Sequence, residues 1–370
     1  MKKAIVIGSG FTGCMFAMML KQKNWDVTVI DKSSLTGGGV RTFYHGGHPY
    51  TYGPRHFIGP EENMPAFEFL NKIVPMRHIK KMNLSYQQKD DFFASYPMHE
   101  DDIKKLSDSE KIFEELENLP KETKANNFED FWIGRVGKTL YERFNKFYNL
   151  KAWQLNDNKK MDAGFLGTVK RKPLESGSRY EFHTGFINAY PEPTDGYNKF
   201  FDVSLEGCNV LLNKEITEVD MDKLTVHCKD EKFSSDLIIS TISPDFLYKS
   251  CWGELAYVGR DFFKIVLPTE NVLPEDVYFL YYPNENEQQT RVTEFKKFTR
   301  HKSKNSLITL EVPSMKNKLY PTMIQSQVDL AQKYIDNLPE KVMSVGRMGT
   351  YRYVDIDDII LQGLEFKKSL

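Results

Sequence analysis

The sequence has little cysteine, no long apolar run and no excess of charge of one sign. Its 370 residues include four scattered cysteines without a C-x-x-C pair, so neither a disulfide framework nor a zinc ribbon is predicted. No stretch approaches the ~20 apolar residues that a membrane-spanning helix needs. The 50 basic and 51 acidic residues leave a net charge of −1, so no global field recruits nucleic acid. We expect a cytoplasmic globular protein with no membrane span and no nucleic acid among its partners.

The sequence also lacks acidic or thiol partners around its one suggestive histidine pair. His45 and His48 flank Gly46 and Gly47. A metal site would need further ligands at close spacing. We interpret both as loop histidines and predict no metal site.

The N-terminal forty residues carry a clear nucleotide-binding pattern. An apolar β-branched run, Ala4–Ile7, precedes Gly8, Gly10 and Gly13, and a helical pattern then leads to a second strand that ends at Asp31. The three glycines allow a tight turn, a close approach of backbone to a pyrophosphate, and close packing of helix on sheet. The first-turn amides of the helix face the phosphates, and an acid roughly 20 residues further on reaches the ribose. We predict a dinucleotide-binding βαβ unit.

A second glycine run, at residues 37–39, favours FAD over NAD. The longer flavin dinucleotide must pass close to backbone again after the ribose, and glycine permits this approach. From this N-terminal unit and one later strand we expect the following cofactor-binding residues: Gly8, Gly10, Phe11, Thr12, Gly13, Asp31, Lys32, Gly38, Gly39 and Ile216.

The order of the segments predicts an α/β fold with interleaved domains. Residues 1–60, 200–260 and 340–370 are assigned to a discontinuous FAD-binding Rossmann-like domain. Within it, Leu237–Thr241 is typical of a parallel strand that returns to the first unit.

Two further domains are expected. Residues 61–165 have mainly helical spacing and are assigned to an inserted helical substrate domain. Residues 166–199 and 261–339 contain short, turn-bounded β-rich runs and one helix, so they are assigned to an antiparallel β-sheet domain.

Aromatic residues are dense between Tyr141 and Trp153. Tyr141 and Phe144 fit a helix that packs an aromatic stripe into the core. Tyr148 and Trp153 lie past that run in polar surroundings, where stacking on a base is the alternative to core packing. Spacing alone leaves both interpretations open.

The segment Ser344–Asp357, which reads S-V-G-R-M-G-T-Y-R-Y-V-D-I-D, resembles the motif G-R-x-G-T-Y-R-Y-x-D-M-D of UDP-galactopyranose mutases. Three further segments are similar to motifs of that family and occur in the same order, at residues 140–153, 290–296 and 319–321. With the N-terminal unit, the resemblance covers essentially the whole chain.

The resemblance implies a flavin-dependent isomerase that interconverts pyranose and furanose forms of a nucleotide sugar, a reaction of polysaccharide biosynthesis. In this family FAD acts in its reduced form, and its N5 bonds to the anomeric carbon of the sugar as the nucleotide diphosphate leaves. The implied partners are the nucleotide sugar and a reductant such as NAD(P)H or a flavin reductase, and a homodimer is the assembly we consider. Because the cofactor carries the covalent chemistry, the protein supplies position and electrostatics.

The same resemblance implies catalytic roles for Arg171, Arg291, Tyr320, Tyr353 and Asp355. The arginines and tyrosines match diphosphate-binding positions, where a guanidinium fork meets a phosphate in a way that an ammonium does not.

Other matches concern the flavin and the base. Arg347, Tyr353 and Asp355 match positions beside the flavin and join the expected cofactor-binding set. A structural ion pair with an acid of the same segment is the alternative for Arg347. Tyr148 and Trp153 match uridine-contacting positions, which favours base stacking over core packing.

The chain departs from the family pattern around the flavin and the sugar. The family motif G-P-H-x-F-H-T has Arg55 and Ile58 in place of its histidines here, and His99 replaces the Asn of Y-P-I-N. We place Arg55, Tyr96 and His99 at the substrate. A guanidinium at Arg55 adds donors for an N-acetyl carbonyl or an extra hydroxyl, so a modified sugar is predicted rather than plain galactose. The Y-R-S motif has lost its arginine, with Arg260 nearby as a substitute.

Two other classes stay open. An amine-oxidase-type FAD oxidoreductase shares the N-terminal unit but needs no ordered set of diphosphate ligands. A flavin-binding protein without activity would explain the lost histidines. Oxygen consumption stoichiometric with substrate would identify the oxidase, whereas a mutase needs only catalytic reductant.

Overall fold

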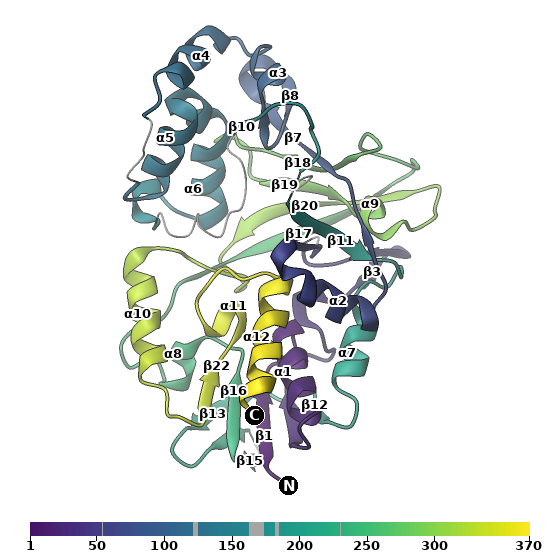
Figure 1. The fold of residues 1–370 in the computed structure, drawn as a ribbon, viewed down its shortest axis with the longest axis vertical. Helices are drawn as coiled ribbons and strands as arrows, with labels where there is room; N and C mark the ends of the chain where they lie inside the picture. The colour runs from purple at the N-terminus through teal and green to yellow at the C-terminus, as the bar shows by residue number, and fades with distance from the viewer. Residues whose placement is uncertain (54, 121–124, 163–173, 182–184, 230) are drawn as a thin grey trace.

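The computed structural model describes residues 1–53, 55–120, 125–162, 174–181, 185–229 and 231–370. Both termini lie at the lower end of the molecule in Figure 1, beside a parallel sheet, and a helical unit lies at the opposite end. A larger sheet lies between them.

A five-stranded parallel sheet forms the lower part. Its strands, in spatial order, are β12 (Asn209–Leu211), β2 (Asp26–Ile30), β1 (Lys3–Ile7), β16 (Leu237–Ser240) and β22 (Val342–Ser344). Ile5 of β1 lies opposite Thr28 of β2 and Ile238 of β16. The parallel strand expected at Leu237–Thr241 is therefore confirmed, and so is the Rossmann-like α/β class.

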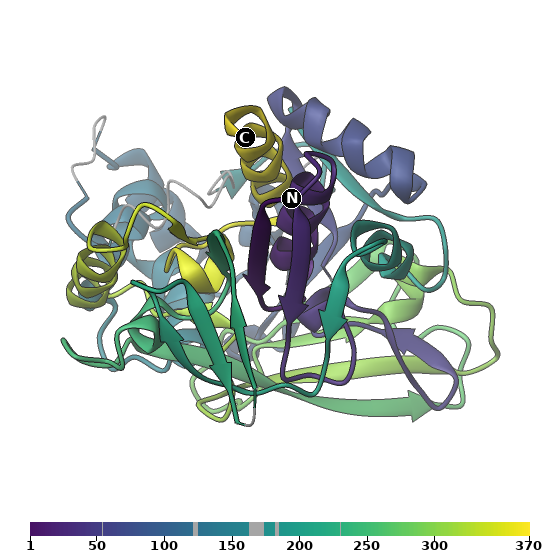
Figure 2. The same cartoon turned by 90° about the horizontal axis from the view of Figure 1, so that it is seen from below.

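Helices cover the parallel sheet because parallel strands are apolar on both faces. The helices α1 (Phe11–Lys21), α2 (Met64–Ile73), α7 (Asn198–Ser204) and α12 (Ile356–Ser369) pack together on one side. Figure 2 shows the N-terminal and C-terminal helices side by side. Phe16 and Phe366 join them with ring centroids 5.0 Å apart.

The opposite side carries a small antiparallel sheet and two helices. The sheet consists of β13 (Ile216–Asp220), β14 (Thr225–Cys228) and β15 (Lys232–Ser234), and the helices are α8 (Pro244–Leu247) and α10 (Gln325–Asp336). The short helix α11 (Gly346–Gly349) follows β22.

A seven-stranded sheet forms the middle of the molecule. Its order is β21 (Tyr320–Pro321), β17 (Tyr257–Leu267), β20 (Ser306–Ser314), β19 (Arg291–Glu294), β18 (Val277–Tyr281), β7 (Met82–Gln87) and β8 (Phe92–Ser95). All neighbours are antiparallel except β18 and β7. The helix α9 (Phe295–Thr299) continues from β19.

The helical unit at the upper end contains α3 (Glu100–Ile103), α4 (Ser109–Glu117), α5 (Phe128–Leu140), the π-helical turn η4 (Tyr141–Lys146) and α6 (Phe147–Trp153). Gly137 has φ of +81° and ψ of +166°, which breaks the regular helix inside α5. An apolar cluster that includes Ile112, Trp132, Phe144 and Trp153 holds the unit together.

Smaller sheets are β5 (Phe57–Pro60) with β11 (Phe186–Pro191) and β6 (Met76–His78), the hairpin of β3 (Phe43–His45) and β4 (His48–Tyr50), and the pair of β9 (Met98–His99) and β10 (Leu174–Glu175). Short 3-10 turns in the described ranges are η1 (Gly38–Val40), η2 (Glu61–Asn63), η3 (Gln88–Asp90) and η5 (Asn158–Lys160).

The predicted domain boundaries differ from this arrangement in several places. α2 and β6 were expected in the helical domain, but α2 packs against α7 and α12, and β6 pairs with β11. β7 and β8 were expected in the helical domain but belong to the seven-stranded sheet. The buried residues of β7 are polar, namely Asn83, Ser85 and Gln87, whereas the alternating apolar residues are only half-buried, so the apolar face does not mark the buried one. β11 was expected in the antiparallel domain but pairs with β5 and β6, since its residues Ile187 and Ala189 fill the core under α2.

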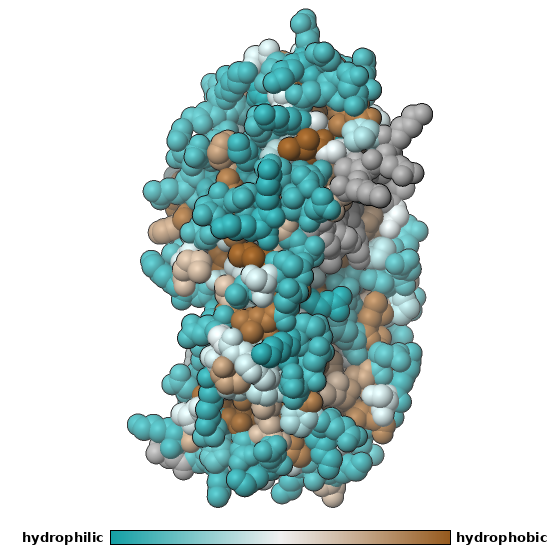
Figure 3. All heavy atoms as spheres, turned by 90° about the vertical axis from the view of Figure 1, so that its left-hand side faces the viewer, coloured by the Kyte–Doolittle hydropathy of each residue, from teal (hydrophilic) through white to brown (hydrophobic). Residues whose placement is uncertain are grey.

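The outer surface in Figure 3 is mainly hydrophilic, with scattered apolar patches. None of the helices in the described part of the chain is both long and apolar enough to cross a bilayer.

Candidate active site

The turn from β1 to α1 uses glycine for three separate reasons. Gly8 has φ of +95°, which side chains disfavour. A Cβ on Gly13 would lie 1.9 Å from the Gly8 carbonyl oxygen, so only glycine lets α1 approach β1 this closely. A Cβ on Gly10 would meet nothing within 4 Å, because Gly10 borders an open cavity. With no side-chain cap on α1, its first-turn amides face a space that fits a pyrophosphate.

The second glycine run lies directly beside this turn. The Gly37 amide donates to the Ser9 carbonyl at 2.7 Å. Gly37 and Gly39 line the same cavity as Gly10. Backbone therefore borders the cavity from two turns, as a flavin dinucleotide requires.

Asp31 at the end of β2 stabilises the glycine turn. Its Oδ2 accepts from the Ser9 amide at 2.6 Å and from the Ser9 hydroxyl at 2.7 Å, and its Oδ1 accepts from the Ser33 amide at 2.8 Å. Asp31 does not line the cavity, and neither do Lys32 or Ile216. Their roles toward the cofactor stay predictions.

One cavity of about 670 Å³ joins the glycine turns to the seven-stranded sheet and the helical unit. It brings together residues predicted from seven separate motifs. The predicted site residues that line it are Gly10, Phe11, Thr12, Gly39, Arg55, Tyr96, Tyr148, Trp153, Arg291, Tyr320, Arg347, Tyr353 and Asp355.

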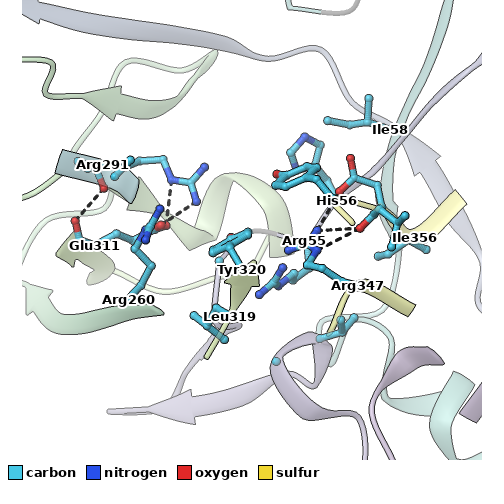
Figure 4. Close-up of a pocket in the computed structure, with 18 of the residues that line it drawn as sticks. Arg55, His56, Ile58, Arg260, Arg291, Glu311, Leu319, Tyr320, Arg347 and Ile356 are labelled. Atoms are coloured by element: carbon cyan, nitrogen blue, oxygen red, sulfur yellow. Dashed lines mark hydrogen bonds and ion pairs between the residues drawn. The ribbon is translucent and has the colours of Figure 1, made fainter. Parts of the chain in front are cut away.

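Two stacked tyrosines and two arginines form the centre of the cavity. The Tyr320 and Tyr353 rings are nearly parallel, 9° apart, with centroids separated by 5.9 Å. The Arg347 guanidinium carbon lies 4.9 Å from the Tyr320 centroid and 4.6 Å from that of Tyr353. Arg260 lies 5.1 Å from the Tyr320 ring. Figure 4 shows Tyr320 between the Arg291–Glu311 pair and Arg347.

The two tyrosines differ in their ionisation, because the nearby cations outweigh burial only at Tyr320. Burial by itself opposes ionisation of Tyr320, but Arg55, Arg347 and Arg260 outweigh it and lower the pKa of Tyr320 below its ordinary value. Burial, assisted by the negative charge of Asp355, raises the pKa of Tyr353 to about 12. Tyr353 thus stays a hydrogen-bond donor at neutral pH.

Arg291 is held by a carboxylate from the adjacent strand. Its Nε and Nη2 donate to the two Glu311 carboxylate oxygens at 2.9 and 2.8 Å. Burial alone would lower the pKa of Arg291, but Glu311 raises it well above the ordinary value. The guanidinium carbon also lies 4.8 Å from the Phe279 centroid. Arg291 is therefore a fixed, permanently charged group at the cavity wall.

Arg347 combines the two roles that were considered for it. Its Nη2 donates to Asp355 Oδ1 at 3.2 Å and to the Val354 carbonyl at 2.9 Å. The same guanidinium lies against both tyrosine rings in the cavity. The ion pair with Asp355 thus orients a cation that also faces ligand space.

The residues that replace the family histidines also line the cavity. Arg55 has φ of +45°, and its buried Nε has no hydrogen-bond partner among the described residues. Ile58 on β5 contributes an apolar side chain. Between them, His56 packs against Phe298 with ring centroids 5.6 Å apart. The cavity wall here is part cationic and part apolar.

The aromatic end of the cavity serves both packing and lining. Trp153 belongs to the core of the helical unit, yet it lines the cavity and meets Tyr320 edge-on at 5.9 Å. Tyr148 lines the cavity and meets Tyr281 edge-on at 5.7 Å. The two interpretations left open by spacing are therefore compatible.

Two predicted substrate residues need separate comment. His99 does not line the cavity, and its placement beside the sugar stays a prediction. Its Nδ1 accepts from the Asp101 amide at 3.2 Å and caps α3, whose first turn needs an acceptor. Arg171 lies outside the described residues.

Several cavity residues were missed or received no role from the sequence. Lys81 lines the cavity although its side chain is only 1% exposed, and it forms an ion pair with the equally buried Glu181. Trp132 and Asn145 line the helical end. Of these residues, Asn145 gave a signal in the sequence, because it is a polar residue within a helical segment rich in aromatic residues.

Comparison with known proteins gives a consistent result. The family model described as UDP-galactopyranose mutase matches residues 143–353, and one for an NAD(P)-binding Rossmann-like domain matches residues 6–73. The chain is 27% identical to dTDP-fucopyranose mutase of Escherichia coli, over 99% of this chain and 97% of that protein. It is 22% identical to a probable UDP-galactopyranose mutase of Klebsiella pneumoniae, over 98% and 93%. A crystal structure of reduced UDP-galactopyranose mutase superposes with a TM-score of 0.83 at 17% identity, covering 100% of this chain and 95% of that one.

Proposed function

The chain belongs to the UDP-galactopyranose mutase family, and from this premise we propose that it is a flavin-dependent isomerase that interconverts pyranose and furanose forms of a nucleotide sugar. The observation that carries the proposal is that one continuous cavity reaches from the dinucleotide turn to the arginines and tyrosines at its centre. Gly10 of the dinucleotide turn lines the same space as Arg291, Tyr320 and Tyr353. A flavin and a diphosphate-linked sugar can therefore meet there.

FAD is the cofactor that we propose. The first-turn amides of α1 and the backbone of Gly10 and Gly37 would hold its pyrophosphate, and Arg347 with Asp355 would lie toward its ring. When bound and reduced, the flavin supplies the nucleophilic nitrogen that attacks the anomeric carbon. NAD(P)H or a flavin reductase is the proposed source of electrons.

The protein's own contribution is to stabilise the leaving diphosphate. Negative charge grows on that group as the anomeric C–O bond breaks, and preorganised cations stabilise it best in a site shielded from water. Arg291 and Arg347 are fixed by Glu311 and Asp355 in such positions. The Tyr320 and Tyr353 hydroxyls are the matching donors, and Arg171 is proposed to join them.

The sugar is proposed to be a modified one. Ile58 gives the cavity an apolar side chain where the family motif has histidine, and an apolar wall suits the methyl group of a deoxy sugar. The relative from Escherichia coli, a dTDP-fucopyranose mutase, supports this choice. Arg55 offers fork-like donors to a further hydroxyl or an N-acetyl carbonyl.

A panel assay tests the function directly. FAD-loaded, reduced enzyme is incubated with dTDP-fucose, UDP-galactose and UDP-N-acetylgalactosamine, and furanose products are separated by chromatography. We expect turnover with only catalytic amounts of reductant. Turnover of UDP-galactose alone would exclude the modified sugar, and stoichiometric oxygen uptake with substrate would indicate an oxidase instead.

Variants test the proposed diphosphate ligands. Arg291→Ala and Arg171→Ala should abolish turnover while bound FAD is retained, because neither residue belongs to the dinucleotide turn. Arg135→Ala, an exposed arginine of α5, is the matched control and should keep full activity. Normal turnover in both cavity variants would refute this assignment.

A further inference from the structure

One lysine of the helical unit inserts its ammonium group into a loop of the seven-stranded sheet. Lys151 Nζ donates to three backbone carbonyl oxygens, at 2.9 Å for Tyr282, 3.0 Å for Asn284 and 2.6 Å for Glu287. All three carbonyls belong to the loop that joins β18 to β19. A lysine ammonium has three N–H donors and no acceptor, so this arrangement uses every donor of Lys151.

The loop is folded around this ammonium. The Tyr282 amide donates to the Thr290 carbonyl at 3.0 Å, which closes the neck of the loop. Within the loop, Asn284 Nδ2 donates to Glu287 Oε2 at 2.8 Å. Carbonyl oxygens that converge on one point can replace the hydration shell of a cation. Here that cation is the side chain of Lys151, which comes from a different part of the fold.

Both partners of this contact continue into the cavity. On α6, Tyr148 lies three residues before Lys151, on the same face of the helix, and it lines the cavity. At the far end of the loop, Thr290 and Arg291 line the cavity from the sheet. The contact therefore joins the helical wall of the cavity to the wall that carries Arg291.

Stability alone does not account for an ammonium in this position. A charged group that leaves water loses a large hydration free energy, and apolar residues often replace buried ionic contacts without loss of stability. Apolar contacts are non-directional, however, so they would let the helix slide along the loop. Three hydrogen bonds that converge on one nitrogen fix both the separation and the orientation of α6 and the loop.

We propose that Lys151 is a positioning residue of the reaction, which fixes the separation between Tyr148 on the helical wall and Arg291 on the sheet wall. The inference rests on the proposed function, because it concerns a substrate that contacts both walls. Lys151 does not itself line the cavity, so it acts through the groups that it holds in place. A misplacement of about 1 Å can lower the rate of a reaction about a hundredfold.

Lys151→Met tests the inference in the FAD-loaded protein at pH 7, because it keeps the length of the side chain and removes its donors. Calorimetry gives the dissociation constant for UDP, and the panel assay gives kcat and KM. We expect UDP to bind about tenfold more weakly, comparable to the loss of one hydrogen bond. The value of kcat/KM should fall about a hundredfold, with kcat reduced as well as KM raised, because the reacting groups are misplaced. Flavin content should stay unchanged.

A second lysine provides a matched control. Lys296 of α9 donates to the carbonyls of Glu270 and Ser303 at 2.6 and 2.7 Å, and it does not line the cavity. Lys296→Met should lower the melting temperature, as Lys151→Met does, but keep the wild-type UDP affinity and kinetics. Equal losses of UDP affinity in the two variants would indicate general destabilisation and overturn the inference.

Restoring the ammonium provides a further readout. Alkylation of Lys151→Cys with 2-bromoethylamine rebuilds a side chain of lysine length and should recover most of the UDP affinity, whereas wild-type protein treated in the same way should not change. If Lys151→Met does not retain flavin, Lys151→Gln, which keeps two N–H donors, takes its place and should lose less affinity. Wild-type affinity in the variant tested, or no recovery after alkylation, would overturn the inference.

The outcomes also separate this inference from the proposed function. Wild-type UDP affinity and kinetics in Lys151→Met, in a protein that isomerises nucleotide sugars, would overturn the positioning role alone. A wild-type protein that neither binds UDP nor isomerises nucleotide sugars would overturn the proposed function, and this inference with it.

Discussion

At the scale of single residues, Tyr320 is the group around which the cavity's cations gather. Arg55, Arg260 and Arg347 all act on its hydroxyl, and together they outweigh the effect of burial on its pKa. Two of the cavity's arginines carry their own counterions, Glu311 for Arg291 and Asp355 for Arg347. The site thus combines charged arginines, each held in place by a carboxylate, with a tyrosine that ionises more readily than usual.

The lowered pKa of Tyr320 predicts a pH dependence of ligand binding. Below this pKa the neutral hydroxyl donates to a diphosphate, and above it the phenolate loses the donor and repels the ligand. UDP affinity should therefore fall over a pH range that lies below the one in which an ordinary tyrosine, with its pKa near 10, loses its proton. Tyr320→Phe should bind UDP roughly tenfold more weakly at neutral pH and show no such fall.

Fluorescence titration with UDP across this range measures the effect. Tyr44→Phe, at an exposed tyrosine, is the control and should keep the wild-type profile. An unchanged alkaline fall in Tyr320→Phe would assign the titration to another group.

The Arg291–Glu311 pair predicts a stability effect. Both side chains are largely buried, so Glu311→Ala leaves a guanidinium without its counterion. We expect the free energy of unfolding to drop by about 3 kcal/mol. Chemical denaturation measures this, with Glu365→Ala in an exposed pair as the control that should change little. Equal effects of both changes would contradict the buried-charge argument.

At the scale of elements, different glycines of the β1–α1 turn serve folding and cofactor binding. Gly13 is needed for packing, since its Cβ would overlap the Gly8 carbonyl, whereas a Cβ at Gly10 would enter only the cavity. The roles of these glycines follow from local backbone geometry. For that reason they could be predicted from spacing alone.

Two alanine substitutions test this separation. Gly13→Ala should lower the melting temperature and prevent flavin binding, because α1 must move away from β1. Gly10→Ala should fold normally yet lose most bound flavin, as its methyl group occupies the space beside the pyrophosphate. Thermal melts and flavin absorbance distinguish the two. Full flavin content in Gly10→Ala would place the cofactor elsewhere.

Other elements could not be predicted in the same way. β7 is polar on its inward face, where Ser85 borders the cavity, so its apolar residues mark the less buried face of the strand. His99 holds a motif position of the family and caps α3. In both cases a neighbouring element decides the role of the residue.

At the scale of the whole molecule, the N-terminal and C-terminal segments belong to the same parallel sheet and its helix layer. β22 completes the parallel sheet that starts with β1, and α12 packs against α1. The C-terminal segment also carries Arg347, Tyr353 and Asp355 into the cavity. Neither the cofactor unit nor the substrate site is complete without it.

Truncation tests this interdependence. A chain that ends at residue 339 should lose cooperative unfolding and flavin binding, because the apolar face of α1 becomes exposed. Removal of residues 368–370 alone, which are exposed, should leave both unchanged. Circular dichroism melts and flavin content provide the readout. A flavin-binding truncated chain would show that the N-terminal unit folds by itself.

The sequence by itself determined the dinucleotide unit, the α/β class and most of the arginines and tyrosines that the fold brings into the cavity. Glycine spacing and long motifs reflect requirements of the local backbone, and these can be recognised from the sequence. Only the tertiary structure decided that Glu311 fixes Arg291, that Lys81 pairs with Glu181, and that Trp132 and Asn145 line the cavity. Those contacts depend on which distant segments pack together in the fold. Polar residues that are buried between such segments show no hydrophobic periodicity in the sequence.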